Sequence, residues 1–378
     1  MDLFVVCAPG LEPVLVAELS ALGVAARQVP GGAETSGGVD ELHRLNFWLR
    51  TATRVLVRLG EMHATTFAEL VRKASVLPFE TVARRGQEVA FRVTCHKSRL
   101  YHSAAVQQRL HEAMERSLGG AVRVVRYDEN ASNPAQLLVA RFDRDVCTVS
   151  ADSSGALLHR RAYRVAQVQA PLRESLAAAM LLAAKYDGTE ALLDPLCGSG
   201  TIAIEAALIA RRRAPGWQRG FAFERWPGHD ARALENLRAT AQAQELPRAP
   251  ALIAASDVDA AAVGATEENA RSAGVIEDLS LRRRPLRNAT AVAGALIATN
   301  PPYGVRLQGE LAGLYRDLGN LVRRSGSRVV ALVPERAPVQ GSKLPWRSLL
   351  RTSNGGLRVQ LLSAGAIPAR GKGFGQEG

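Results

Sequence analysis

The stretch Asp194-Pro195-Leu196-Cys197-Gly198-Ser199-Gly200-Thr201 decides the fold. It follows the apolar segment 191–193, which has the length of a short buried strand, and it precedes the apolar segment 202–211, which has helical length. Glycines at such a turn let the backbone approach a ligand closely, and the start of the helix presents free N–H groups to a carboxylate. The spacing matches neither the GxGxxG pyrophosphate fingerprint nor a P-loop. The stretch therefore predicts a ligand-binding loop at the carboxyl end of a strand in an α/β sheet.

Short apolar segments continue to alternate with helical ones after this loop. A helix over 259–273 is closed by Gly274, and strands are expected over 251–255, 279–283, 296–298, 328–334 and 357–365. This alternation predicts an α/β fold with a doubly wound, mostly parallel sheet. The insertion 211–250 carries two tryptophans and two phenylalanines and is expected to pack as a cap near the strand ends. The glycine-rich tail 371–378 is expected to fray.

Polar side chains follow two of the expected strands. Asp257 follows the second strand, where a carboxylate can accept both hydroxyls of a ribose, although such a residue can also cap the next helix. Asn300-Pro301-Pro302-Tyr303 follows the fourth strand. Two successive prolines impose an extended, rigid turn, so the asparagine side chain and a proline carbonyl can accept hydrogen bonds from one exocyclic amine. Tyr303 could stack on the base that carries the amine, whereas a lone Asn-Pro-Pro is also typical of a capped turn.

The residues before the glycine loop predict an α+β region with two basic patches. A strand over 3–7 and a helix over 12–22 begin the chain, and later segments add strands over 55–59, 89–95, 136–141 and 145–151 and helices over 67–75 and 104–117. The turn 96–102 could hold a phosphate through Lys97 and Arg99. The segment 159–164 could contact a phosphate backbone through Arg160, Arg161 and Arg164, with Tyr163 stacking on a base. Both patches are equally well read as solvated basic segments.

Composition indicates a polyanionic partner and no membrane span. The formal net charge is +12, and only five of the 48 basic residues are lysines. Arginine suits phosphate oxygens, although a GC-rich genome also enriches arginine. Cys7, Cys95, Cys147 and Cys197 lie far apart without CxxC spacing, so neither a metal site nor a disulfide framework is expected, and a reducing cytoplasm is the default location. No segment has the length of a membrane helix or the pattern of a signal peptide, and 378 residues predict two or three domains.

Taken together, these motifs resemble a known family. Asp194 to Thr201, Asp257 and Asn300 to Tyr303 resemble the amino-methyltransferases that use S-adenosylmethionine. Further similarity narrows the match to the large-subunit ribosomal RNA guanine-N2 methyltransferases, and it lies at 8–12, 158–164, 170–178 and 213–216. The resemblance covers nearly the whole chain. It implies a Rossmann-like class I methyltransferase domain over 156–378, of which 156–185 is linker and lead-in helix, after a ferredoxin-like domain over 1–60 and an RNA-binding THUMP domain over 61–155.

The resemblance also implies roles for individual residues. Gly198 and Gly200 would shape the methionine pocket with Asp194, and Asp257 would hold the ribose. Other expected cofactor contacts lie in the same loop at Pro195, Cys197, Ser199 and Thr201. The adenine contact expected after the third strand is not evident in 282–288, where Asn288 is a weak candidate. Catalysis would fall to Asn300, Pro301, Pro302 and Tyr303, which would receive the target amine.

The implied reaction is in-line transfer of a methyl group to a guanine amine of RNA, most simply ribosomal RNA. Positioning and exclusion of water would supply most of the rate, and no strong general base is required. The target base would turn out of its stack to reach the pocket. Three alternatives stay open: a transfer RNA guanine methyltransferase, a DNA adenine-amine methyltransferase, and an RNA-binding assembly factor without activity. A second methyltransferase domain, which some family members carry, is not expected in this chain, and the oligomeric state is left unassigned.

Overall fold

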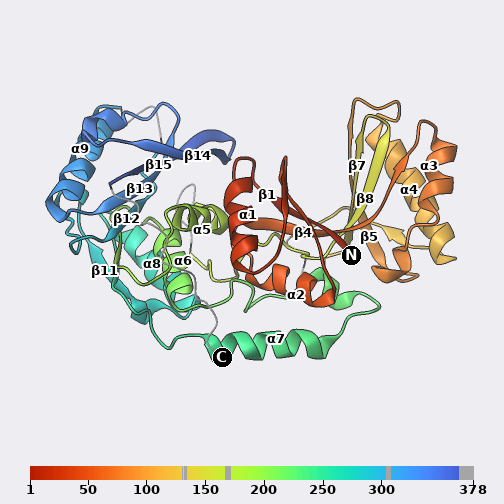
Figure 1. Cartoon of the computed structure of the whole chain (residues 1–378), viewed down its shortest axis with the longest axis horizontal. Helices are drawn as coiled ribbons and strands as arrows, with labels where there is room; N and C mark the ends of the chain where they lie inside the picture. The colour runs from red at the N-terminus through yellow and green to blue at the C-terminus, as the bar shows by residue number, and fades with distance from the viewer. Residues whose placement is uncertain (130, 132–133, 167–171, 304–307, 366–378) are drawn as a thin grey trace.

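The computed structural model describes residues 1–129, 131, 134–166, 172–303 and 308–365, whose strands form two sheets (Figure 1). The helices are α1 (Glu12–Ala21), α2 (Val39–Trp48), α3 (Phe67–Ala74), α4 (Ser103–Leu118), α5 (Glu174–Ala183), α6 (Thr201–Ala210), α7 (Ala231–Gln244), α8 (Ala260–Ser272) and α9 (Gln308–Ser325). The tail 371–378, which was expected to fray, lies outside the described residues, as does part of the segment 170–178.

The first sheet contains the strands of the N-terminal half. They are β1 (Asp2–Cys7), β2 (Arg27–Val29), β3 (Gly32–Ser36), β4 (Ala52–His63), β5 (Glu88–His96), β6 (Arg123–Val124), β7 (Gln136–Asp143) and β8 (Val146–Asp152), in the order β2-β3-β1-β4-β8-β7-β5-β6. The predicted boundary at residue 60 falls inside β4, because this strand pairs with β1 along its first half and with β8 along most of its length. Two structural units therefore share one continuous sheet.

The second sheet contains the strands that follow α5. They are β9 (Leu192–Asp194), β10 (Ile253–Asp257), β11 (Leu279–Arg283), β12 (Leu296–Thr299), β13 (Arg328–Pro334), β14 (Arg347–Asn354) and β15 (Leu357–Ala364), in the order β11-β10-β9-β12-β13-β15-β14. The first five strands in this order pair in parallel, and β15 is antiparallel to both of its neighbours. The prediction of a doubly wound, mostly parallel sheet is confirmed. Because the chain runs outward from β9 to β11 and then returns to β12 on the other side of β9, the topological switch point lies between β9 and β12.

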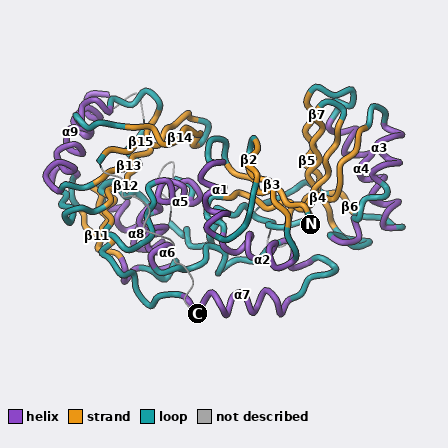
Figure 2. The backbone as a smooth tube through the Cα atoms, in the orientation of Figure 1, coloured by secondary structure: helices purple, strands orange, loops and turns teal. Residues whose placement is uncertain are grey.

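The sequence predicted that the insertion 211–250 packs as a cap near the strand ends, but its aromatic residues pack against the N-terminal half. Helix α6 carries the chain back to the opposite edge of the sheet, and from there the insertion runs to the N-terminal half. Phe223 stacks on His43 of α2 with ring centroids 4.5 Å apart, and the Trp226 indole N–H donates to Gln136 of β7 at 2.7 Å. Figure 2 shows α7 along the bottom of the molecule, below α2. The aromatic residues of the insertion therefore join the two halves.

The buried apolar side chains connect the same two halves. One cluster extends from Leu3 and Val5 in β1 through α5 and α6 to the second sheet. A smaller cluster, which includes Tyr315 and Leu318, packs α9 against the other face of the second sheet. Of the helices that the structure describes, none is both long and apolar enough to cross a membrane.

Candidate active site

The glycine loop joins the end of β9 to the start of α6 in a conformation that requires glycine. Gly198 and Gly200 have φ values of +54° and +83°, in the left-handed region. A Cβ atom on Gly200 would also lie 2.6 Å from the Thr266 side chain of α8. Thr266 donates its hydroxyl to the Gly198 carbonyl at 2.8 Å, so α8 packs closely behind the loop. The glycines therefore allow both the turn and this close contact.

Asp257 ends β10 and lies against the glycine loop. Its Oδ2 atom accepts the Gly198 N–H at 3.0 Å, and its Oδ1 atom accepts the Asp259 N–H at 3.1 Å. Asp259, in contrast, caps α8 by accepting the Ala261 N–H at 2.9 Å. The helix cap is thus Asp259, and the half-buried Asp257 carboxylate is placed at the carboxyl edge of the sheet beside the loop.

Asp194 ends β9 beneath the same loop and is 1% exposed. Its Oδ1 atom accepts the Leu196 N–H at 3.3 Å, whereas its Oδ2 atom is buried without a hydrogen-bond partner in the described part of the chain. Burial raises the pKa of this carboxyl group to about 8, and the nearby Asp257 charge adds to the effect. A cationic group of a ligand at Oδ2 would stabilise the carboxylate.

Because the Asp194 pKa is raised in the fold, the unfolded chain binds fewer protons on this group between about pH 4 and pH 8. We expect this group to make the ligand-free protein lose stability as pH rises through that range and to contribute no further change above it. The loss should be on the order of a few kcal/mol. Asp194→Asn should flatten this part of the dependence, which thermal melts from pH 5 to pH 9 would show. Equal slopes for both proteins would contradict the assignment.

The Asn300-Pro301-Pro302-Tyr303 turn begins where β12 ends, beside β9. Leu296 and Ile297 of β12 pair in parallel register with Leu192 and Leu193 of β9, so the turn and Asp194 leave the sheet at the same edge. The Tyr303 hydroxyl donates to Oδ1 of Asn300. Burial raises the pKa of the Tyr303 phenol to about 12, so it stays protonated at neutral pH. The asparagine oxygen thus already serves as a hydrogen-bond acceptor at this edge.

The basic segment 159–164 differs most from its prediction. Arg161 and Tyr163 are each 3% exposed, and both donate to Glu205 Oε1 of α6, at 3.4 Å and 3.1 Å. Glu205 is fully buried and requires cationic and hydroxyl partners inside the protein. The expectation that Arg161 and Tyr163 contact RNA is therefore wrong, because both side chains stabilise the junction between the two halves.

Arg164 is held at the back of the glycine loop. It donates to Glu174 at 2.8 Å, to the Thr201 hydroxyl at 3.1 Å and to the Ser199 hydroxyl at 3.3 Å. Arg160 stays exposed and donates to the Glu129 carbonyl at 3.3 Å. The segment is thus a connector that reaches the loop, and of its four predicted RNA contacts only Arg160 has an exposed side chain.

The other predicted residues keep accessible positions or frame the loop. Lys97 and Arg99 are exposed on the turn between β5 and α4. Asn288 is exposed in the short 3-10 helix η4 (Leu286–Asn288), after β11. Cys197 is buried, and its N–H donates to the Ser256 carbonyl at 3.0 Å, which ties the loop to β10. Pro195 enters the loop between the buried Asp194 and the half-buried Leu196.

Asn269 of α8 belongs to the site, and the sequence reading missed it. It is 1% exposed, and its amide nitrogen donates to the Ser199 and Ala166 carbonyls at 3.0 Å and 2.9 Å. Its Oδ1 atom accepts the N–H groups of Val165 and Ala166, each at 2.9 Å. A polar residue within the buried alanine stripe of α8 is the sequence signal that could have revealed it.

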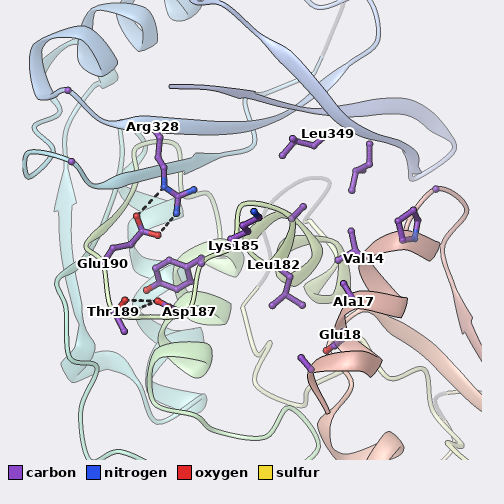
Figure 3. Close-up of a pocket in the computed structure, with 18 residues that line it drawn as sticks. Val14, Ala17, Glu18, Leu182, Lys185, Asp187, Thr189, Glu190, Arg328 and Leu349 are labelled. Atoms are coloured by element: carbon purple, nitrogen blue, oxygen red, sulfur yellow. Dashed lines mark hydrogen bonds and ion pairs between the residues drawn. The ribbon is translucent and has the colours of Figure 1, made fainter. Parts of the chain in front are cut away.

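A cavity of about 1120 Å³ lies away from these residues (Figure 3). Its lining includes Val14 and Ala17 of α1, Leu182 of α5, and the Glu190–Arg328 ion pair. Glu190 precedes β9 and Arg328 begins β13, so the cavity opens at the amino edge of the second sheet. It is therefore separate from the loop and turn at the carboxyl edge.

Comparison with known proteins supports the reading of both halves. Residues 161–341 match the family described as RMKL-like, methyltransferase domain, and residues 2–56 match the RlmL ferredoxin-like domain. A relative in Syntrophotalea carbinolica, named ribosomal RNA large subunit methyltransferase K/L, is 35% identical over 95% of this chain and 53% of its own length. The chain thus spans about half the length of this curated relative.

Solved structures share the whole architecture. SMU.472, described as a methyltransferase and complexed with SAH, has a TM-score of 0.86 at 26% identity, covering 98% of this chain and 99% of its own. A protein from Listeria monocytogenes, described as a predicted N6-adenine-specific DNA methylase, has a TM-score of 0.83 at 28% identity, covering 95% of each chain. Residues 161–341 are therefore similar to the RMKL-like methyltransferase domain, and residues 2–56 are similar to the RlmL ferredoxin-like domain.

Proposed function

We propose that the chain transfers a methyl group from S-adenosylmethionine to the exocyclic N2 amine of a guanine in large-subunit ribosomal RNA. The observation that carries the proposal is that the Asn300 turn and the glycine loop flank the topological switch point at one edge of the sheet. The name of the Syntrophotalea relative supports the RNA substrate, and SMU.472 complexed with SAH supports the cofactor.

The residues present fit S-adenosylmethionine. The cofactor supplies an activated methyl group on a sulfonium. The buried, unpartnered Oδ2 atom of Asp194 suits its ammonium group, and Gly198 and Gly200 leave room for close backbone contact. The Asp257 carboxylate suits the ribose hydroxyls. A ribose bound there would replace the Gly198 N–H or the Asp259 N–H as a hydrogen-bond donor to this carboxylate. Asn288 stays the candidate for the adenine contact.

The Asn300 turn receives the target amine in this proposal. Asn300 Oδ1 and the Pro301 carbonyl accept its two protons, which localises the nitrogen lone pair out of the base plane. Tyr303 releases its hydrogen bond to Asn300 and stacks on the guanine, while Pro302 keeps the turn extended. Because the turn is rigid and close to the methyl donor, positioning supplies most of the rate and no strong base is needed.

The N-terminal half holds the surrounding RNA. The exposed Lys97 and Arg99 on the turn after β5 contact phosphates, and the region 61–155 acts as the THUMP domain. The cysteines that the structure describes are all free thiols, as befits a protein that works in the reducing cytoplasm. Neither a metal ion nor a membrane is needed for this reaction.

The test is transfer of a labelled methyl group from S-adenosylmethionine to separated ribosomal RNA and transfer RNA, followed by nucleoside analysis. We expect labelled N2-methylguanosine from the large-subunit ribosomal RNA fraction. Label confined to transfer RNA would favour the transfer RNA guanine enzyme, and labelled methyladenine would contradict the guanine assignment. A DNA substrate in parallel checks the adenine-amine alternative, and cofactor binding without any transfer would indicate an inactive assembly factor.

A further inference from the structure

Four arginines stand at the rim of the candidate active site without carboxylate partners. They lie where β11 ends and η4 begins, at Arg282, Arg283, Arg284 and Arg287, and we call them the arginine rim. The chain contains no acidic residue between Asp278 and Glu310. Among the residues that the structure describes, none of the four forms an ion pair, whereas the exposed Arg27, Arg116 and Arg271 each pair with a glutamate.

The arginine rim is placed at the same edge of the sheet as the glycine loop. β11 pairs in parallel with β10, so that Arg282 lies opposite Ser256 and Arg283 opposite Asp257. The Arg284 N–H donates to the Asp257 carbonyl at 2.8 Å, and Arg283 Nε donates to the Val258 carbonyl at 3.2 Å. The backbone of the arginine rim is therefore fixed directly beside the residue proposed to bind the ribose.

The charged groups of the arginine rim face solvent. Arg282, Arg283 and Arg287 are exposed, and Arg284 is half-buried with a hydrogen bond to the Thr290 hydroxyl at 3.2 Å. Arg324 of α9 donates to the carbonyls of Arg287 and Ala289, so it adds a further positive charge beside the arginine rim. Three of the four guanidinium groups are therefore exposed at the edge of the sheet next to the cofactor site, and none is ion-paired within the described part of the chain.

We infer that the arginine rim binds RNA phosphates that flank the target nucleotide, an inference that rests on the proposed function. β11 and β12 are separated by three strand spacings, about 14 Å in all, so one short stretch of RNA can contact both the arginine rim and the Asn300 turn. Guanidinium groups suit phosphate oxygens and need not read the bases. Phosphates held here would keep the backbone in place while the base turns toward Asn300.

The test compares Arg282→Ala/Arg287→Ala with Arg282→Lys/Arg287→Lys, and with Arg232→Ala/Arg271→Ala as the matched control. Arg232 and Arg271 are exposed on α7 and at the end of α8, away from the carboxyl edge of the sheet. Binding of fragmented large-subunit ribosomal RNA is measured against salt concentration, with the affinity for S-adenosylmethionine measured separately. Loss of two phosphate contacts should weaken RNA binding about tenfold or more and reduce the salt slope by about 1.4.

The lysine pair should restore most of the RNA affinity, and every variant should bind S-adenosylmethionine as the parent does. If the alanine pair at the arginine rim binds RNA with the affinity and salt slope of the control, the inference is overturned. These measurements do not depend on turnover. A parent protein that binds RNA through the rim but methylates none of it would refute the proposed function alone.

Discussion

Asn300→Ala is expected to lower methyl transfer by about 100- to 1,000-fold, the range found when one positioned hydrogen-bonding group is removed from a transition state. The reason is that the side-chain oxygen is one of the two acceptors proposed for the target amine. The affinity for S-adenosylmethionine should stay unchanged, because Asp194 and Asp257 supply the contacts proposed for the cofactor. Single-turnover transfer to ribosomal RNA, together with cofactor titration, measures both effects.

Tyr303→Phe is the matched control for this substitution. Asn300→Ala removes an acceptor and also leaves the Tyr303 hydroxyl without its partner, whereas Tyr303→Phe breaks the same hydrogen bond and keeps the asparagine. If the acceptor matters, Tyr303→Phe should retain most of the transfer rate. Survival of transfer within a few-fold in Asn300→Ala would show that the assigned role is wrong.

Glu205→Ala is expected to lower the free energy of unfolding by about 3–5 kcal/mol, as found when one partner of a buried ion pair is removed. Arg161 and Arg50 are 3% and 7% exposed, and both direct a guanidinium group toward this carboxylate. Arg50 Nη1 lies 3.9 Å from Glu205 Oε2, which is too long for a hydrogen bond but within reach of strong attraction. In the alanine variant, both guanidinium groups stay buried but lose this carboxylate.

Glu267→Ala provides the surface comparison. Glu267 pairs with Arg271 on the exposed side of α8, so its removal should change stability by less than about 1 kcal/mol. Glu205→Gln should fall between the two, because the amide oxygen can still accept from Tyr163. Urea unfolding curves for the three variants would decide the point, and similar midpoints for Glu205→Ala and Glu267→Ala would contradict it.

The parts of the site that could be predicted from the sequence share one property: they are local. Glycine at positions 198 and 200 indicates a left-handed backbone conformation, and the prolines at 301 and 302 constrain the turn that they form. Asp257 directly follows a recognisable buried strand. Each of these residues therefore reports its position through its immediate neighbours, and the parallel topology then brings them to one edge of the sheet.

The rest depends on partners far away in the chain. In the sequence, Arg161 and Tyr163 belong to a basic segment that could be solvated. Their buried partner Glu205 lies about forty residues later in a mostly apolar helix, so the neighbouring residues do not reveal it. A single carboxylate in such a helix signals that a buried cation must come from elsewhere, but it does not say which one. The predicted domain boundary at residue 60 does not coincide with an interruption of the sheet for a similar reason, because the pairing of β4 with β8 is a long-range contact.

Arg164 and Asn269 link the connector between the two halves to the glycine loop. Arg164 belongs to the connector and donates to the Ser199 and Thr201 hydroxyls of the glycine loop, and Asn269 hydrogen-bonds both to Ala166 of the connector and to the Ser199 carbonyl. A ligand that orders the loop and an RNA that orders the N-terminal half would then favour one another by an equal free energy, whichever arrives first. An N-terminal half taken from another enzyme would lose this coupling unless the connector, Arg164 and Asn269 were transferred together with it.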